Sequence, residues 1–296
     1  MRSLALVLSL ALALAGAARA AEPESPVLVD PAWLAQHLDD PDLVILHVAG
    51  LQADYDRGHL PGARFLWLTG VAESTPAQSF VLPPLPVVRE RLERLGVDAQ
   101  SRIVLYSMFG DVAAAGRVLA TLDQLGLGGR TSILDGGLEA WQAAGQLLST
   151  VTPKIRRGHL PRAADARAIV DLAYVTAHAR DSVVRLVDAR GLPAYNGAPG
   201  TAGFRPGHIP GALSLPSASL TDSTDHYLPA DSLRTRFARA GVQPGQHLIA
   251  YCSVGRSACP LYVAARVLGY DVRLYDGSYE EWSRHLELPI EGKPAK

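Results

Sequence analysis

The 296-residue sequence contains little cysteine: Cys252 and Cys259 are its only two, and they lie close together in the last third of the chain. So few cysteines exclude a disulfide-rich scaffold. A bond between these two would close a very short loop, in which close approach of the Cβ atoms is not assured. No second cysteine pair and no His-x-x-x-His spacing accompanies them, so we expect no metal and no cofactor.

The sequence also has no large net charge, because it contains 28 basic and 29 acidic residues and its formal net charge is −1. A chain without a net field has no general attraction for nucleic acid or anionic membranes. We therefore expect no nucleic-acid partner, and any anion site has to be built from local groups.

Long apolar runs are absent except at the start, where residues 4–17 read LALVLSLALALAGA after Arg2 and before Ala18-Arg19-Ala20. This run is shorter than the roughly 20 residues that span a bilayer. The pattern predicts a cleavable signal peptide over residues 1–20 and export to the periplasm, with secretion into the medium as the alternative. We expect no membrane span.

The remaining chain repeats itself with a period of about 145 residues. Residues 58–63 and 207–212 read Gly-His-Leu-Pro-Gly-Ala and Gly-His-Ile-Pro-Gly-Ala, and ILDGGLEAW at 133–141 matches LYDGSYEEW at 274–282. A repeat of this length indicates a duplicated domain rather than a solenoid. We expect an N-terminal domain over 24–150, a solvated linker over 151–165 and a C-terminal domain over 166–291.

Each copy alternates short apolar strands with amphipathic helical segments, such as LPVVRERLERLGV at 85–97 and DSLRTRFARAGV at 231–242. Fully apolar strands that alternate with helices are typical of a parallel sheet covered on both faces. The fold class is therefore α/β, with a mostly parallel sheet and helices on both faces in each domain.

Cys252 follows the predicted strand 247–251 directly, and Pro260 stands in the first turn of the helix predicted over 258–270. Ligands gather at the carboxyl ends of parallel strands. Cys252 therefore lies where a parallel sheet places its reactive groups.

The loop CSVGRS, residues 252–257, combines several features that stabilise an anion. Gly255 permits the backbone angles that a ring-shaped loop needs, so the amides of Ser253, Val254, Gly255, Arg256 and Ser257 can point inward. The helix dipole and the Arg256 charge add to this, and together they favour a thiolate at Cys252, which is the nucleophilic form. Cys259 lies inside the helix and is interpreted as a buried structural residue.

In combination, GHIPGA, Asp188-x-Arg190, the Cys252 loop and Asp276-Gly-Ser-x-x-x-Trp282 resemble the rhodanese family, the tandem-domain sulfurtransferases. The resemblance covers nearly all of the chain after residue 20. It implies two tandem rhodanese-like domains, with Cys252 taking up sulfane sulfur as a persulfide that the loop amides stabilise. Arg190 and Arg256 would bind the anionic end of the sulfur donor, and Asp188 would orient the loop or an arginine.

The first copy departs from this pattern at four positions, where it has His47, Ala49, Ser107 and Asp111 in place of Asp188, Arg190, Cys252 and Arg256. A hydroxyl cannot hold a persulfide, and an aspartate repels an anionic donor. We therefore expect a catalytically silent N-terminal domain that walls one side of the cleft. Since that copy keeps His59, we interpret both His59 and His208 as turn residues.

The loop length argues against the related cysteine phosphatases, which use C-x5-R, because Arg256 follows Cys252 by four residues and position 258 is alanine. The mercaptopyruvate-type loop of the family reads C-G-[SA]-G-V-T, whereas CSVGRS shares only its glycine and carries a cation. We expect thiosulfate as donor, and cyanide or a thiol as acceptor, including a thiol protein such as a thioredoxin-like reductant. The alternatives are 3-mercaptopyruvate as donor, a sulfur-carrying or redox partner protein without turnover, and a binding module with an unreactive Cys252.

Overall fold

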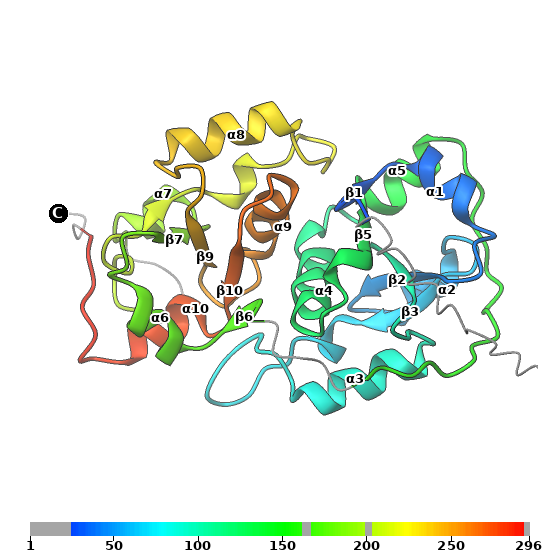
Figure 1. Ribbon diagram of the computed structural model, residues 1–296, viewed down its shortest axis with the longest axis horizontal. Coiled ribbons are helices and arrows are strands. Elements are labelled where there is room, and N and C mark those ends of the chain that lie inside the picture. The colour runs from blue at the N-terminus through cyan, green and yellow to red at the C-terminus, as the bar shows by residue number, and fades with distance from the viewer. Residues whose placement is uncertain (1–24, 162–166, 199–202, 293–296) are drawn as a thin grey trace, which may run out of the picture.

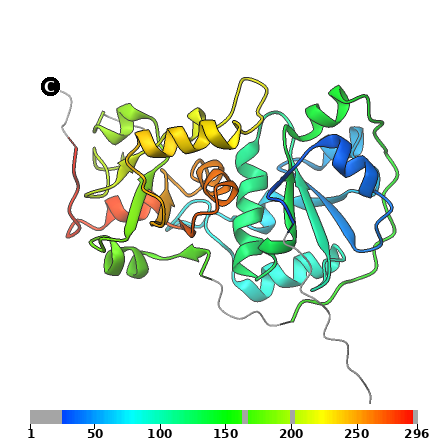
Figure 2. The same ribbon diagram turned by 45° about the horizontal axis from the view of Figure 1, so that its top comes forward.

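The computed structural model describes residues 25–161, 167–198 and 203–292. The predicted signal peptide lies outside these residues, so export stays a prediction. Two α/β domains lie side by side (Figures 1 and 2). Within the described residues, no helix is long and apolar enough to cross a membrane.

The first domain holds a five-stranded sheet in the order β1-β5-β4-β2-β3, and all its strand pairs are parallel. Its elements in chain order are β1 (Leu28–Val29), α1 (Pro31–His37), β2 (Leu43–Ala49), α2 (Gln52–Arg57), β3 (Arg64–Trp67), α3 (Leu85–Arg94), β4 (Arg102–Tyr106), α4 (Val112–Gln124), β5 (Thr131–Leu134) and α5 (Gly137–Ala143).

The second domain repeats this topology in a five-stranded parallel sheet of order β6-β10-β9-β7-β8. Its elements are β6 (Ile169–Val170), α6 (Leu172–His178), β7 (Val184–Asp188), α7 (Leu192–Tyr195), β8 (Leu213–Ser214), α8 (Ala230–Arg239), β9 (His247–Tyr251), α9 (Cys259–Val267), β10 (Val272–Tyr275) and α10 (Ser278–Arg284). The predicted fold class is confirmed.

Helices cover both faces of each sheet, as the apolar strands require. Leu34 of α1 and Trp141 of α5 are buried on one face of the first sheet, while Leu92 of α3 and Val118 of α4 are buried on the other. The short edge strands, β1 and β3 in the first sheet and β6 and β8 in the second, carried no usable sequence pattern and were not predicted.

The linker is less free than predicted, although most of its described residues are exposed. Glu93 of α3 accepts hydrogen bonds from the Arg157 guanidinium at 2.9 Å and from the Leu160 amide at 3.0 Å. The Leu160 side chain is buried. This segment is therefore docked on α3 rather than being a plain solvated connector.

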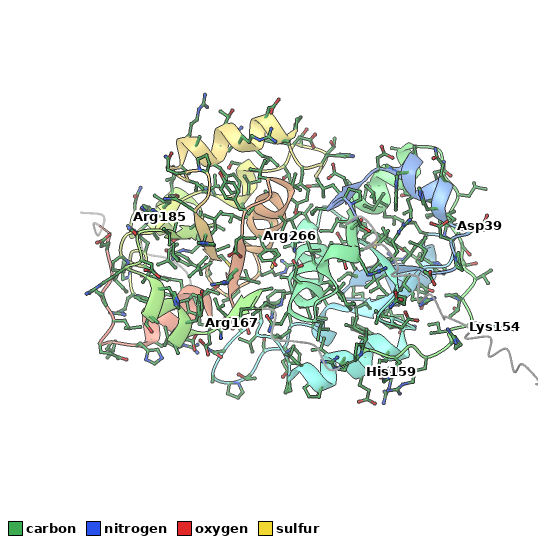
Figure 3. All side chains as sticks on the ribbon, viewed as in Figure 1. Asp39, Lys154, His159, Arg167, Arg185 and Arg266 are labelled. Atoms are coloured by element: carbon green, nitrogen blue, oxygen red, sulfur yellow. The ribbon has the colours of Figure 1, made fainter. Side chains whose placement is uncertain are left out.

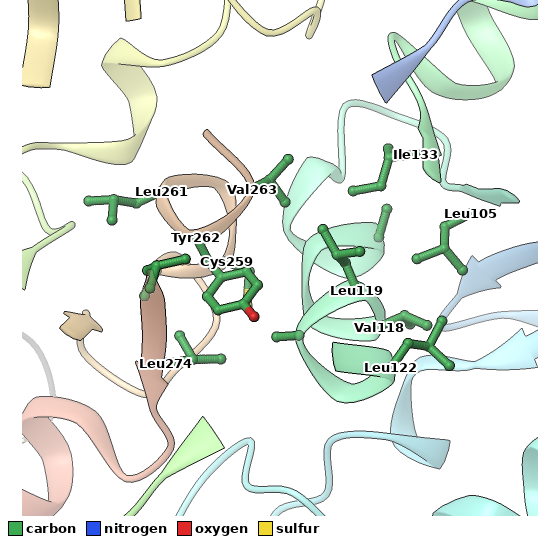
Figure 4. Close-up of a cluster of buried hydrophobic side chains, with 14 of the residues drawn as sticks. Leu105, Val118, Leu119, Leu122, Ile133, Cys259, Leu261, Tyr262, Val263 and Leu274 are labelled. Carbon is green, nitrogen blue, oxygen red and sulfur yellow. The ribbon is translucent and has the colours of Figure 1, made fainter. Parts of the chain in front are cut away.

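The domains meet through α4 and α9, whose apolar side chains face one another (Figure 4). A Cβ at Gly116 would lie 3.0 Å from the carbonyl oxygen of Cys259, so a side chain there would crowd the contact between the two helices. One apolar cluster includes residues of both helices, among them Val118 and Val263. At the edge of this contact, Arg266 of α9 pairs with Asp123 of α4 (Figure 3).

Each domain also extends an arm to the other, which we name the first arm (residues 73–82) and the second arm (residues 221–228) (Figure 1). The Leu82 amide of the first arm donates to Asp276 Oδ2 at 2.9 Å, and the Tyr227 amide of the second donates to Asp135 Oδ1 at 2.9 Å. Since Asp135 and Asp276 are equivalent in the repeat, the two contacts correspond to each other.

Candidate active site

Cys252 is the first residue after β9, as predicted, and its side chain is fully buried. Its amide donates to Ser278 Oγ at 3.2 Å, and its carbonyl accepts from the Tyr279 amide at 2.9 Å. The Ser253 carbonyl accepts from the Glu280 amide at 2.8 Å. Residues 276–280, which we name the supporting segment, therefore hold the loop in place.

The loop that follows Cys252 presents free backbone donors. Within the part of the chain that the structure describes, the amides of residues 253–257 make no hydrogen bond. Gly255 has φ +81°, and a Cβ there would lie 2.8 Å from the Asp276 carbonyl, so the predicted need for glycine is met. Consecutive free amides at the start of a helix bind anions. The loop can thus stabilise an anionic sulfur.

Arg256, on the same loop, is turned toward the other domain. Its Nη2 donates to Asp111 Oδ2 at 2.6 Å, and both side chains are partly exposed. The two residues line a cavity of about 480 Å³ beside residues 108–111, the loop of the N-terminal domain that is equivalent to the Cys252 loop. Sequence reasoning singled out both charges but missed their pairing, because 145 positions separate them.

Arg190 and Asp188 form a buried pair at the end of β7. Arg190 Nη2 lies 2.6 Å from Asp188 Oδ2 and also donates to the Gly207 carbonyl at 2.8 Å. The guanidinium lies 4.0 Å from the Tyr279 ring centroid. Burial works to lower the pKa of Arg190, but the hydrogen bond and charge of Asp188 raise it overall. The Asp188 carboxylate therefore holds the Arg190 side chain in a buried position at the end of β7.

Cys259 is a free, buried thiol and the first residue of α9. Its Sγ donates to the Gly255 carbonyl at 3.2 Å, and burial raises its pKa to about 12. Cys252 is also free, so the two form no disulfide. A thiol that stays protonated in the apolar interior fits the predicted structural role.

The equivalent N-terminal loop, residues 107–112, is held by contacts within its own domain. The Ser107 carbonyl accepts from the Leu138 amide at 3.0 Å, which matches the contact of Cys252 with Tyr279. Here, however, Glu139 Oε1 accepts the Phe109 amide at 2.8 Å. An exposed carboxylate of the same domain thus binds one loop amide, whereas the equivalent Val254 amide has no hydrogen-bond partner among the described residues.

The two motif histidines are structural. The His59 ring stacks on Tyr55 at 3.9 Å between centroids, and the His208 ring stacks on Tyr195 at 3.7 Å. The backbones of both histidines pair with the chain just after each domain's last helix. This agrees with the interpretation that neither acts in catalysis.

Sequence reasoning missed Arg117, a fully buried arginine of α4 whose Nη1 lies 2.8 Å from Asp276 Oδ1. The signal that would have found it is a single charge in the otherwise apolar stretch AAAGRVLATL at 113–122. Charged residues are rarely fully buried unless paired.

The rhodanese-like domain model matches residues 30–144 and 171–285. The chain is 29% identical to the 3-mercaptopyruvate sulfurtransferase of Escherichia coli K12, over 88% of this chain and 95% of that one. It is 33% identical to a probable 3-mercaptopyruvate sulfurtransferase of Pseudomonas aeruginosa, over 90% and 98% of the two chains. It is 28% identical to the thiosulfate sulfurtransferase of Azotobacter vinelandii, over 90% and 97%.

Among solved structures, the crystal structure of SseA from Escherichia coli, described as a 3-mercaptopyruvate sulfotransferase, superimposes with a TM-score of 0.75 at 28% identity. That match covers 86% of this chain and 99% of the other. Two matching domains and relatives of this similarity over nearly their whole length give one conclusion. The chain belongs to the rhodanese family and is a tandem-domain, rhodanese-type sulfurtransferase.

Proposed function

We propose that this sulfurtransferase moves sulfane sulfur from thiosulfate to a thiophilic acceptor through a persulfide on Cys252. The observation that carries the proposal is the run of amides at residues 253–257, which have no partner within the described ranges and lie between the buried Cys252 and the start of α9. Such a loop favours a thiolate and stabilises the persulfide anion that replaces it.

In the first half-reaction, the Cys252 thiolate attacks the outer sulfur of thiosulfate. The S–S bond of thiosulfate breaks, its electron pair leaves with sulfite, and Cys252 holds a persulfide anion. In the second half-reaction, cyanide or a thiolate attacks the outer persulfide sulfur, and Cys252 leaves as thiolate. The cycle predicts double-displacement kinetics.

Arg256 supports thiosulfate as the donor. Its pair with Asp111 is partly exposed, and such ion pairs contribute only about 0–1 kcal/mol. A compact dianion near the loop can therefore compete with Asp111 for the guanidinium. Arg190, by contrast, is held in a buried pair and is better placed to shape the site than to move toward a substrate.

Steady-state kinetics with thiosulfate and cyanide test this donor. Arg256→Ala should raise KM for thiosulfate on the order of tenfold, because hydrogen bonds to charged groups are worth about 1.5–3 kcal/mol. Asp111→Asn is the matched control: it frees Arg256 and should leave KM unchanged or lower it. Equal KM values for wild type and Arg256→Ala would mean that Arg256 does not bind thiosulfate.

The second candidate donor is 3-mercaptopyruvate, which the names of two of the relatives favour. With this donor, the Cys252 thiolate attacks the sulfur of 3-mercaptopyruvate and the C–S bond breaks. Its electron pair leaves with the enolate of pyruvate, which takes up the thiol proton, and Cys252 holds the same persulfide anion. A kcat/KM for 3-mercaptopyruvate well above that for thiosulfate would replace the first proposal with this one. Persulfide formation without turnover on small thiophiles would instead indicate a carrier whose acceptor is another thiol protein.

We also propose that the protein acts in the periplasm, and the pattern of residues 1–20 supports this. Mass determination of protein recovered from an osmotic-shock fraction tests it. A mature chain that begins at Ala21 is the expected result, and a full-length chain in the cytoplasmic fraction would contradict the proposal.

A further inference from the structure

Arg117 is a buried charge that lies between the two domains. Its Nη1 lies 2.8 Å from Asp276 Oδ1, its Nε donates to the Val71 carbonyl at 3.3 Å, and its guanidinium lies 5.4 Å from the Phe80 ring centroid. A guanidinium with no exposure to solvent is costly to bury unless it is well paired. Its carboxylate partner belongs to the other domain.

That partner, Asp276, is the first residue of the supporting segment. Its carbonyl packs against Gly255, where a Cβ would lie 2.8 Å away, and Ser278 accepts the Cys252 amide two residues later. Tyr279 and Glu280 donate their amides to the carbonyls of Cys252 and Ser253. The position of Asp276 thus fixes the backbone on which the cysteine loop rests.

The first arm holds the same segment. The Ser79 amide donates to Glu280 Oε2 at 2.8 Å and its hydroxyl to Oε1 at 3.2 Å, while the Leu82 amide donates to Asp276 Oδ2. Together with Arg117, these contacts attach both ends of the supporting segment to the domain that lacks the catalytic cysteine.

The equivalent positions on the other side of the repeat do not build this support. Tyr262 stands where Arg117 stands in the first copy, and its hydroxyl donates to Asp123 Oδ2 at 2.6 Å rather than to a residue under a loop. Among the described residues, no arginine or lysine pairs with Asp135, the equivalent of Asp276, which accepts the Tyr227 amide. Burial raises the pKa of Asp135.

We propose that Arg117 is a positioning residue for sulfur transfer: through Asp276 it holds the supporting segment, and with it the Cys252 loop, in the reactive geometry. The proposal rests on the proposed function, since it takes Cys252 as the sulfur carrier. It assigns the silent domain a part in catalysis beyond walling the cleft.

The test compares the two equivalent aspartates. Asp276→Asn removes the charge that Arg117 binds, while Asp135→Asn makes the same change in the silent copy and keeps an oxygen for the Tyr227 amide. Rapid-quench mass spectrometry of persulfide formation from thiosulfate should show Asp276→Asn slowed on the order of 10- to 100-fold, because small misplacements of reacting groups have effects of this size. Asp135→Asn should stay within about twofold of wild type.

Arg117→Gln and Arg117→Lys give a second readout. The glutamine variant should slow persulfide formation as Asp276→Asn does and change the pH dependence of Cys252 alkylation. The lysine variant, which keeps the charge, should recover part of both. Melting temperatures establish that each variant is folded at the assay temperature. If Arg117→Gln does not fold, Arg117→Lys and the aspartate pair still decide.

Equal rates and equal pH profiles for folded Asp276→Asn and Asp135→Asn would overturn the proposal and leave Arg117 as an interface residue only. A wild-type protein that forms no persulfide with thiosulfate or 3-mercaptopyruvate would instead overturn the proposed function. The two failures are thus distinguishable.

Discussion

The two copies of the domain have the same strand order and differ mainly in what surrounds one loop. In the C-terminal copy, the loop amides after Cys252 have no partner among the residues that the structure describes, and the carboxylate of Glu280 reaches Ser79 of the other domain. In the N-terminal copy, the equivalent carboxylate of Glu139 is exposed, stays on its own domain and accepts a hydrogen bond from the Phe109 amide. The copy that has Ser107 in place of the cysteine thus also has one of its loop amides bound by a carboxylate.

The largest expected effect follows from the cysteine itself. Cys252→Ser should lower sulfur transfer by about 10⁴-fold or more, as removal of a nucleophile does in other enzymes. Adding Ser107→Cys to that variant should not restore transfer, because Glu139 and Asp111 place negative charge at that loop. Cyanolysis assays on both variants check this, and sulfur uptake by the double variant would show that these two carboxylates do not prevent it.

A smaller effect, on the free energy of unfolding, is expected from the buried pair of Asp188 and Arg190, which the N-terminal copy lacks. Asp188→Asn leaves the buried Arg190 without its counterion, so unfolding free energy should fall by about 3–5 kcal/mol. Asp54→Asn, which breaks the pair with the exposed Arg57, should change it by less than about 1 kcal/mol. Urea unfolding of both variants measures the difference, and similar losses would mean that Asp188 and Arg190 are not a buried pair.

The two copies share a buried tryptophan, and substituting it should lower the stability of both by a similar amount. Trp141 Nε1 donates to the Leu147 carbonyl at 3.0 Å and Trp282 Nε1 to the Pro289 carbonyl at 2.9 Å, and both rings are buried. Trp141→Phe and Trp282→Phe should each cost about 1–3 kcal/mol, since each leaves a carbonyl without its donor. Chemical denaturation followed by circular dichroism checks this. Clearly different losses of unfolding free energy would show that the two tryptophans contribute unequally to stability despite their similar contacts.

The smallest effect concerns Asp135, whose pKa is raised from 3.8 by burial. Because its pKa is higher in the folded state, this carboxyl stabilises the fold fully at pH values below 3.8, its ordinary pKa. The stabilisation is lost as the pH rises through the pKa of the folded state. Asp135→Asn is free of that loss, so its melting temperature relative to wild type should rise as pH increases across this range. A melting-temperature difference that does not change with pH would mean that the pKa of Asp135 is not raised by folding.

Most of the architecture could be predicted from the sequence because the repeat and the apolar strands are local patterns. The strand at 247–251 and the loop at 252–257 lie where those patterns placed them, and the helix predicted over 258–270 is observed at Cys259–Val267. The edge strands β1, β6 and β8 have two residues each, which is too short for a period to show.

What the sequence did not predict are the contacts between the domains. The pair of Arg256 with Asp111 and that of Arg117 with Asp276 depend on how two folded copies pack, and no local pattern encodes that packing. The same holds for Glu139 and Glu280, which occupy equivalent positions but bind different partners. The reactive residue was thus predictable, whereas its support from the other domain was not.

A persulfide on Cys252 is tested most simply by intact-mass spectrometry of the protein before and after thiosulfate, with Cys252→Ser beside the wild type. We expect the wild type to gain the mass of one sulfur atom, cyanide to remove it and peptide mapping to assign it to Cys252. No gain with thiosulfate or 3-mercaptopyruvate, or an equal gain in Cys252→Ser, would mean that Cys252 does not carry the sulfur.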